Sequence, residues 1–270
     1  MNTKENIFKS LEVEVLNTNK PQDTEYFNFH KRRFERLYDF VVSKNPTGKK
    51  LRVLELGSHY LHTSYIINAL GHELHGVDVS EFWELDFVKE RSKKLGIKEI
   101  SENDLANFHA LDAIEGEYDL ILFTEIMEHI TFNPVNFWKK IHHKTADGGM
   151  IYISTPNSFN LPNIVRSVKN MVTFNSIGIS AEDILDKVTY GHHWKEYSAK
   201  EVQRYFQLLS DDFEVEIHKY HYKKFEMKGP FLMFKILSKI GNLTGFLSEE
   251  LEIIVRVKKK QGWKKELPRY

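Results

Sequence analysis

The chain contains no cysteine among its 270 residues. Disulfide bonds, zinc sites built on Cys thiolates and a Cys nucleophile are therefore excluded. The hydrophobic fraction of 41% is ample for a sizeable core, so the composition indicates neither a disordered chain nor a small disulfide scaffold. Length and composition together predict one globular domain with an elaboration.

The chain also lacks a net charge, because 38 basic residues balance 38 acidic ones. The whole molecule then has no electropositive field with which to hold a polyanion, which disfavours nucleic acid as a partner. A local basic stretch at Lys258–Lys265 fits a solvated C-terminal tail better than a binding patch.

No hydrophobic run is long enough to cross a bilayer. The most apolar stretch, Pro230–Ile240, is short and carries Lys235 and Lys239. Residues 1–15 mix Lys with Glu and do not resemble a secretory signal. We therefore expect a soluble cytoplasmic protein, in which residues 230–240 could contact a membrane surface or another subunit.

Strands and helices alternate from residue 51 onward. This rhythm predicts βαβ units and an α/β fold with a doubly wound, mostly parallel seven-stranded sheet and helices on both faces. Strands are expected at residues 51–56, 73–77, 97–102, 118–124, 150–154, 213–221 and 251–257, and helices at 22–45, 61–70, 82–95, 133–144 and 198–209. Asp147-Gly148-Gly149 is expected to be a turn before the fifth strand.

This rhythm divides the chain into four predicted segments. They are an N-terminal helical cap (1–48), a Rossmann-like cofactor-binding core (49–156), an inserted lid or substrate segment (157–197) and a C-terminal part of the sheet with an amphipathic helix (198–270). Ligands of α/β sheets bind beyond the carboxyl ends of the strands, so the insertion is placed to cover that edge.

A glycine and an acid follow the first two strands. Gly57 ends the first strand, and Asp78 ends the second one 21 residues later. Glycine permits a tight turn with close approach of the backbone to a ligand, and the acid can accept hydrogen bonds from two ribose hydroxyls. The pair favours a nucleoside ligand over a simple helix cap at Asp78.

Four motifs in order extend this pattern. They are Val53–Gly57, Gly76–Asp78, Tyr118–His129 and Asp147–Asn157. The chain resembles the class I S-adenosylmethionine-dependent methyltransferases over about residues 50–222. Gly191–Ser198 is similar to a branch common in bacterial polysaccharide and secondary-metabolite gene clusters. This branch implies O-methylation, or sometimes N- or C-methylation, of a sugar or small molecule, with S-adenosylhomocysteine as the second product.

The resemblance assigns roles to individual positions. It implies that Glu55 and Gly57 border the methionine part of the cofactor, that Asp78 holds the ribose, and that Asp104 with Leu105 meets the adenine, a role for which Asp112 is less favoured. Thr124 and Glu125 are expected to line the cofactor and face the acceptor. In the loop after the first strand, Ser58 and His59 join the expected cofactor contacts.

The first loop departs from the family pattern. Family members usually have glycines at positions matching 57, 59 and 61, and here His59 and Leu61 replace two of them. These side chains could narrow the pocket, or His59 could hydrogen-bond the cofactor carboxylate. A degenerate, non-catalytic nucleoside-binding or partner subunit is therefore an alternative function. A nicotinamide-dependent oxidoreductase is a weaker one, because the Gly-x-Gly-x-x-Gly spacing is missing.

Histidines provide the candidate catalytic groups. Removal of a proton from an acceptor hydroxyl suits an imidazole, and we rank His193 narrowly before His192, and both before His129 with Glu128 beside it. Glu125, Glu128 and His129 would share one face of a helical turn, so a metal-assisted O-methyltransferase, with His192 or His193 as a further ligand, is another alternative. The acceptor itself and the oligomeric state are not specified by the sequence.

Overall fold

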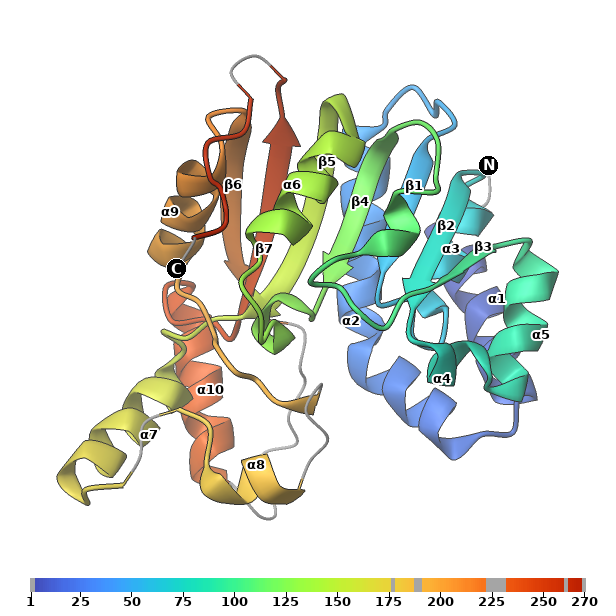
Figure 1. Cartoon of the computed structure of the whole chain (residues 1–270). Coiled ribbons are helices and arrows are strands. Elements are labelled where there is room, and N and C mark those ends of the chain that lie inside the picture. Colours follow the sequence, from blue (N-terminus) through green and yellow to red (C-terminus); the bar gives the residue numbers. More distant parts are fainter. Residues whose placement is uncertain (1–2, 176–177, 187–190, 222–231, 260–261, 269–270) are drawn as a thin grey trace. The chain divides into compact units, whose positions relative to one another are not determined.

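The computed structural model describes residues 3–175, 178–186, 191–221, 232–259 and 262–268 (Figure 1). The chain forms two compact units: unit 1 contains residues 1–122 and 143–146, and unit 2 contains residues 123–142 and 147–270. Neither unit coincides with one of the four segments predicted from the sequence.

Seven strands form one sheet in the order β3-β2-β1-β4-β5-β7-β6. Their bounds are β1 Arg52–Leu56, β2 Glu73–Asp78, β3 Lys98–Ser101, β4 Tyr118–Thr124, β5 Thr145–Pro156, β6 Phe213–Tyr220 and β7 Glu250–Val257. β2 pairs in parallel with β1 and with β3, whereas β7 pairs antiparallel with β5 and with β6. The predicted doubly wound α/β fold is confirmed.

Unit 1 contains a helix at the N-terminus, α1, in addition to the one predicted at residues 22–45. Its helices are α1 Lys4–Asn17, α2 Pro21–Lys44, α3 His62–Ala69, α4 Ser80–Trp83, α5 Asp86–Leu95 and the 3₁₀ turn η1 His109–Leu111. α1 buries Ile7, Phe8, Leu11 and Val15, which pack with residues of α2 and α3. The helical spacing of these four apolar residues could have predicted α1 from the sequence, although Lys and Glu residues separate them.

A buried ion pair ties the helices of unit 1 together. Asp23 of α2 and Arg91 of α5 are both excluded from solvent, and an Asp23 oxygen lies 2.7 Å from Arg91 Nη2. Asp23 also lies 2.7 Å from His62 Nε2 in α3. Burial by itself raises the pKa of Asp23, but the hydrogen bonds to His62 and Arg91 hold it below its ordinary value. Arg91 also donates to the carbonyl of Tyr60.

Unit 2 contains the remaining helices. They are η2 Met127–His129, α6 Val135–Lys144 (which ends in unit 1), α7 Leu161–Val172, α8 Ala181–Asp186, α9 Ala199–Leu209 and α10 Leu232–Thr244. Trp138 is fully buried in an aromatic core with Phe123, Phe137 and Phe206. A reciprocal capping box between Ser198 and Glu201 starts α9 where the sequence predicted it.

Two predicted boundaries are wrong. The helix expected at 82–95 is broken into α4 and α5, because Leu85 is extended and the buried Trp83 Nε1 donates to the Ile100 carbonyl. The turn expected at Asp147–Gly149 before the fifth strand is part of that strand, because β5 already begins at Thr145, directly after α6. Within β5, Gly148 has a φ of 75°, a left-handed backbone conformation that glycine adopts without strain.

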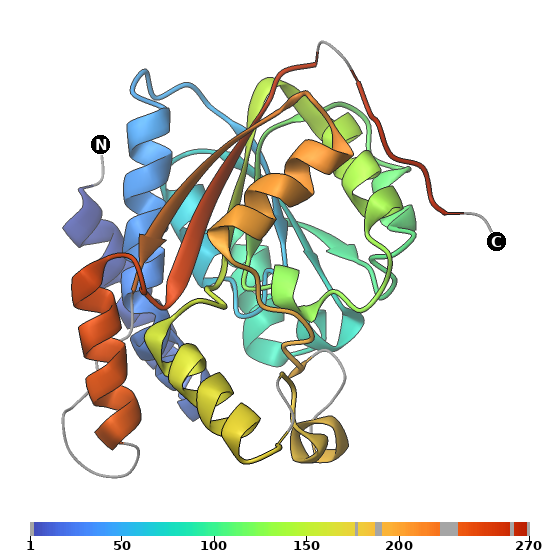
Figure 2. The same cartoon turned by 90° about the vertical axis from the view of Figure 1, so that its left-hand side faces the viewer.

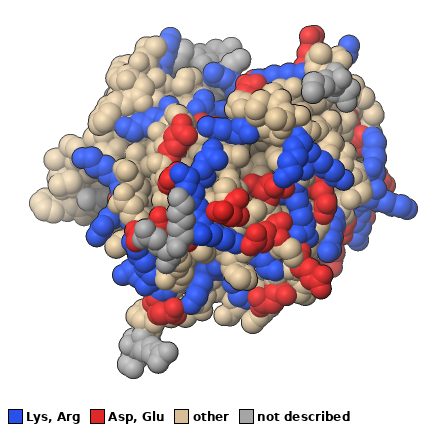
Figure 3. Space-filling model, turned by 90° about the horizontal axis from the view of Figure 1, so that it is seen from above, with Lys and Arg blue, Asp and Glu red and all other residues tan. Residues whose placement is uncertain are grey.

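Charged side chains are mixed in sign on the face seen in Figure 3. Within the C-terminal basic stretch, Lys258 pairs with Glu214 and Lys264 pairs with Asp211. This agrees with a solvated tail, and residues 260–261 lie outside the described ranges. Among the described residues, no helix has both the length and the apolarity that a membrane span requires.

Candidate functional site

The loop after β1 is joined to the end of β2 by backbone hydrogen bonds. The amides of Gly57 and Ser58 both donate to the carbonyl of Val77, with N–O distances of 2.9 and 3.2 Å. Gly57 adopts a φ of 68°, which explains the glycine there. Gly76 lacks room for a side chain, because a Cβ would lie 2.7 Å from Ser58 Oγ. The ends of the two strands therefore lie close together, as the sequence predicted.

His59 and Leu61 keep the left-handed backbone that glycine favours. Their φ angles are 49° and 63°, so positive φ occurs at all three positions where the family usually has glycine. The Leu61 side chain is fully buried against Trp83, Phe87 and Val88. The loop therefore keeps a left-handed backbone at positions 59 and 61, although neither residue is glycine. The Leu61 side chain is placed in the protein core.

Asp78 is fixed by the loop that it faces. Its Oδ2 accepts from the His59 amide at 2.6 Å, and its Oδ1 accepts from the Val79 amide at 2.8 Å. Burial raises the pKa of Asp78 to about 6, although both amide hydrogen bonds act to lower it. Each carboxylate oxygen can accept a further hydrogen bond, which leaves capacity for two ribose hydroxyls.

The His59 ring is held among aromatic side chains. Its centroid lies 4.2 Å from that of Tyr26 and 4.5 Å from that of Phe82. Burial lowers the pKa of His59 to about 3, so the ring is neutral at physiological pH. Its Nδ1 is buried and has no hydrogen-bond partner in the protein. A buried side-chain nitrogen without a partner in the loop after β1 can bind a polar ligand such as the predicted cofactor.

Glu55 lies at the end of β1 and is nearly excluded from solvent. The Ser64 hydroxyl donates to its carboxylate. Burial raises the pKa of Glu55 to about 8, and the negative charge of Asp78 adds to this shift. A bound cation, such as the ammonium group of an amino acid, would favour the ionised form of this carboxyl group.

The predicted adenine contact lies in an exposed turn. Glu102 donates its amide to the Asp78 carbonyl at 3.0 Å, which brings the turn beside the end of β2. Asp104 accepts from the Ala106 amide and from the Asn107 side chain, and Leu105 is half-buried. Asp112 is exposed at the end of η1. The turn that contains Asp104 and Leu105 thus begins beside the end of β2, and their contact with adenine stays a prediction.

In unit 2, an acidic turn follows β4. Thr124 and Glu125 are half-buried, and Glu125 takes a positive φ of 55°. Glu125 is attached to β5 twice: its amide donates to the Ser154 carbonyl at 2.8 Å, and its carboxylate accepts from the Ser154 hydroxyl at 2.7 Å. β5 therefore fixes this turn in place.

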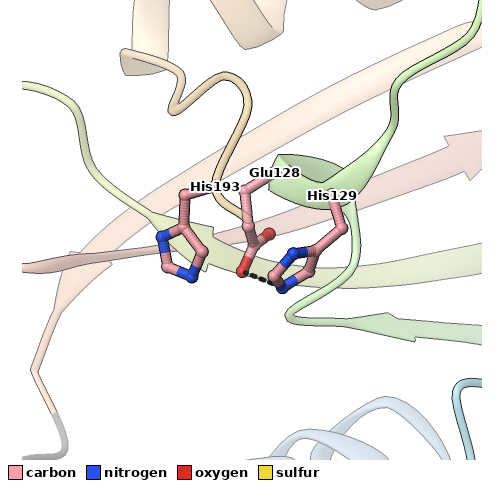
Figure 4. Close-up of side chains that lie close together, drawn as sticks. All are labelled: Glu128, His129 and His193. Atoms are coloured by element: carbon pink, nitrogen blue, oxygen red, sulfur yellow. Dashed lines mark ion pairs between the residues drawn. The ribbon is translucent and has the colours of Figure 1, made fainter. Parts of the chain in front are cut away.

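Glu128, His129 and His193 come together in unit 2 (Figure 4). One possible ligand atom from each lies within 4.8 Å of the others, and no other such set of three or more acidic, His or Cys residues occurs among the described residues. Glu128 is buried, accepts from the Thr155 hydroxyl at 2.9 Å, and has its pKa raised by burial and by the nearby Glu125. The predicted metal site consisted of Glu125, Glu128 and His129, with His192 or His193 as a further ligand. In the structure the group consists of Glu128, His129 and His193, without Glu125.

His129 is oriented by the inserted segment. Its Nδ1 lies 2.9 Å from the carbonyl oxygen of His192, which can only accept a hydrogen bond. Nδ1 therefore carries the proton, and Nε2 is the nitrogen available to a ligand or substrate. Burial lowers the pKa of His129. The Trp194 amide also donates to the Glu128 carbonyl, so residues 192–194 are docked on η2.

His193 and His192 differ in their surroundings. His193 is exposed, and its Nδ1 lies 3.2 Å from Glu196 Oε1, whereas His192 is buried. The Asn163 amide donates to the other oxygen of Glu196 at 2.5 Å. Both histidines border an open cavity of about 470 Å³ in unit 2, whose walls also include Asn163, Arg166, Trp194 and Lys195.

Several site residues were not predicted. Ser154 and Thr155 position the two carboxylates of the turn, and Glu196 and Asn163 position His193. The signal for Ser154 and Thr155 was available, because both end a buried strand next to the acidic turn.

Comparisons with known proteins bear on the family and the fold of the chain. The chain matches a family model described as a methyltransferase domain over residues 26–214. No curated protein sequence matches it. A magnesium protoporphyrin IX methyltransferase from Synechocystis PCC 6803 with bound S-adenosylhomocysteine is 10% identical, with a TM-score of 0.54 and coverage of 89% of this chain and 88% of that one.

Two further solved structures are similar. A plantazolicin methyltransferase, BamL, is 14% identical with a TM-score of 0.52, covering 95% of this chain and 100% of that one. A methyltransferase from Archaeoglobus fulgidus is 17% identical with a TM-score of 0.51, covering 86% and 99%. At these low identities the solved structures support only the fold. The match to the family model covers more than half of the chain and establishes the family. The chain therefore belongs to the methyltransferase-domain family.

Proposed function

We propose that this methyltransferase uses S-adenosylmethionine to methylate a hydroxyl group of a sugar, glycan or other small polar molecule. When bound, the cofactor supplies an electrophilic methyl group on a sulfonium and is released as S-adenosylhomocysteine. The bound S-adenosylhomocysteine in two of the similar structures supports this choice. The resemblance of residues 191–198 to enzymes of polysaccharide and secondary-metabolite assembly supports a cytoplasmic glycan or small-molecule acceptor.

The residues of unit 1 provide the cofactor contacts in this proposal. Asp78 accepts hydrogen bonds from the ribose hydroxyls, and Asp104 with Leu105 meets the adenine. Gly57 and Ser58 lie at the methionine end of the cofactor with Glu55, whose buried carboxyl group would ionise opposite an ammonium group. His59 donates from its unsatisfied Nδ1 to the cofactor carboxylate.

His193 is the proposed general base. Its Nδ1–H donates to Glu196, which leaves Nε2 to take the proton from the acceptor hydroxyl as the new O–C bond forms. Glu196 fixes the ring and stabilises the imidazolium that results, so it is a positioning residue. This His193–Glu196 pair at the edge of a 470 Å³ cavity is the observation that carries the proposal.

The cavity also suits a polar acceptor. Trp194 provides an aromatic face on which a sugar ring can stack, and Arg166, Asn163 and Lys195 provide hydrogen-bond donors. The experiment is a screen of sugar nucleotides and glycans for release of S-adenosylhomocysteine. A product methylated on oxygen supports the proposal, and one methylated only on nitrogen or carbon contradicts it.

A metal-assisted reaction is the second candidate, because Glu128, His129 and His193 form a group with the composition of a divalent metal site. The hydrogen bond from His129 to a backbone carbonyl is the outer contact that metal-binding histidines usually make. A metal would polarise the acceptor hydroxyl, and His193 would then be a ligand. Chelation distinguishes the two: full loss of activity on removal of divalent ions, with recovery on adding Mg²⁺ or Mn²⁺, supports the metal.

A further inference from the structure

Two helices of unit 2 expose an unusual amount of apolar surface. Of the 22 large apolar side chains that are exposed in the described part of the chain, ten lie in α7 and α10, and three more (Phe159, Phe174 and Phe246) lie within two residues of their ends. Scattered exposed apolar residues are normal, but a concentration on neighbouring helices marks an interaction surface. α7 and α10 lie side by side in both cartoon views (Figures 1 and 2).

Most of the exposed apolar residues of α10 form one face, which leaves out Phe234. Met233, Ile236, Ile240 and Leu243 follow one another at intervals of three or four residues, and Met233 and Leu243 are 73% and 79% exposed. The opposite side of α10 contains the buried Ser238 and Gly241. A Cβ on Gly241 would lie 2.6 Å from the Leu247 carbonyl oxygen and 3.0 Å from Leu161 Cβ of α7, so glycine is needed where both segments pack on α10.

α7 has the same organisation. Val165, Val168 and Val172 are exposed at helical spacing, and Pro162 is its only buried residue. Phe159 before α7 and Phe174 after it are exposed as well, Phe174 almost completely. α7 and α10 therefore each present an apolar face to solvent.

The charges that accompany these faces have one sign. α7 carries Arg166 and Lys169, α10 carries Lys235 and Lys239, and neither helix contains an acidic residue. Residues 222–231, which lie outside the described ranges, add three lysines and one glutamate by sequence. The acidic residues of the insertion are in α8, where Asp183 bonds Ser180, and at Glu196, which is paired with His193.

We infer that α7 and α10 dock this protein on an anionic membrane surface. Helices with an apolar face bordered only by Lys and Arg are typical of segments that lie in the plane of a bilayer interface, where the apolar face enters the acyl boundary and the cations meet acidic headgroups. A second copy of the chain would bring the same four cations together in the contact, which disfavours a symmetric dimer through this surface.

This docking bears on the acceptor, provided that the proposed function holds. Asn163 and Arg166 of α7 also line the cavity beside His193. A docked α7 would therefore hold that cavity near the headgroup layer, where a lipid-linked glycan presents its sugar. The docking itself requires neither cofactor nor acceptor, so it can be tested separately from methyl transfer.

The test is co-sedimentation of the full chain with vesicles of phosphatidylcholine alone and of phosphatidylcholine mixed with phosphatidylglycerol. We expect binding to the anionic vesicles that weakens with added salt, and at least about tenfold weaker partition for the double variant Met233→Asp/Leu243→Asp. Lys239→Glu should weaken binding to anionic vesicles as well. Leu16→Asp, at an exposed apolar position of α1, is the matched control and should bind normally.

Three results would overturn the inference. The first is no binding to anionic vesicles by a folded, monomeric protein. The second is equal binding to neutral and anionic vesicles. The third is a concentration-dependent dimer in light scattering that Leu243→Asp dissociates, without any vesicle binding, which would make the surface a contact between copies. Circular dichroism of each variant shows whether the fold is retained.

Discussion

The backbone amide of His59 donates to the Asp78 carboxylate over 2.6 Å, which links the most unusual residue of the first loop to the acid at the end of β2. The loop therefore helps to set the position and the protonation of the proposed ribose-binding group. Because Asp78 has its pKa raised to about 6, its ability to accept two hydroxyl hydrogen bonds depends on pH near neutrality.

Asp78→Asn should weaken cofactor binding. The substitution replaces a charged acceptor by a neutral amide that keeps one acceptor oxygen, which should cost about 1.5–3 kcal/mol in total, so affinity should fall roughly tenfold to a hundredfold. In the wild type, affinity should also fall as the pH drops from 8 to 5, because the carboxylate becomes protonated. Calorimetric titration at both pH values checks this. Equal affinities for the variant and the wild type would remove Asp78 from the site.

His59→Gly tests whether the loop has degenerated. The substitution relieves left-handed strain of about 1 kcal/mol and loses ring contacts of similar size, so thermal stability should change little. Cofactor affinity should fall several-fold, because the Nδ1 donor is lost. If the variant instead binds the cofactor more tightly than the wild type, His59 obstructs the site and the degenerate alternative gains support.

Glu55→Gln should alter how stability depends on pH. The pKa of Glu55 is about 8 in the folded protein and about 4.5 when unfolded, so folding favours the protonated form. That stabilisation is complete below pH 4.5 and is lost as the pH rises to 8, a loss on the order of 3–5 kcal/mol. Urea unfolding without cofactor should show Glu55→Gln gaining stability relative to wild type between pH 5 and pH 9. The exposed Glu84→Gln is the control and should show no such gain.

His193→Gln and Glu196→Gln separate the base from its positioning residue. His193→Gln should lower kcat by about 10²–10⁴-fold, with the affinity for the cofactor unchanged. Glu196→Gln should have a smaller effect on kcat and should shift the pH–rate profile, because it alters the charge beside the imidazole. Chelators should leave both the wild type and Glu196→Gln unaffected. A wild-type rate that requires an added divalent ion would favour the metal mechanism.

Asp23→Ala should destabilise unit 1 strongly. It leaves the buried Arg91 without its carboxylate partner, and breaking a buried ion pair in this way costs about 3–5 kcal/mol. Asp39→Ala, which breaks the exposed pair with Lys4, is the matched control and should cost about 1 kcal/mol or less. Chemical unfolding measures both. Similar small losses for the two variants would show that the buried pair adds little to stability.

Most of the sheet could be predicted because local patterns determine it. The apolar run Tyr118–Thr124 is a strand with the predicted bounds, and the strand end at Asp78 lies within one residue of the prediction. The turn predicted at Asp147–Gly149 was wrong because a glycine such as Gly148 occurs both in turns and in irregular strands. Only the pairing of strands in the sheet decides between the two.

The candidate site was predicted less completely because its contacts join distant parts of the sequence. Glu128 and His129 are neighbours in sequence, but His193 meets them only because residues 192–194 dock on η2. The contact between Tyr26 and His59 likewise depends on how α2 packs in unit 1. Local spacing carries no information about such contacts, whereas it did predict that Gly57 and Asp78 end neighbouring strands.

Isothermal titration calorimetry with S-adenosylmethionine and S-adenosylhomocysteine tests the central claim most directly. We expect saturable one-to-one binding of both molecules by the wild type and weaker binding by Asp78→Ala. Absence of heat from either molecule at high micromolar concentration, with the protein shown to be folded, would contradict it.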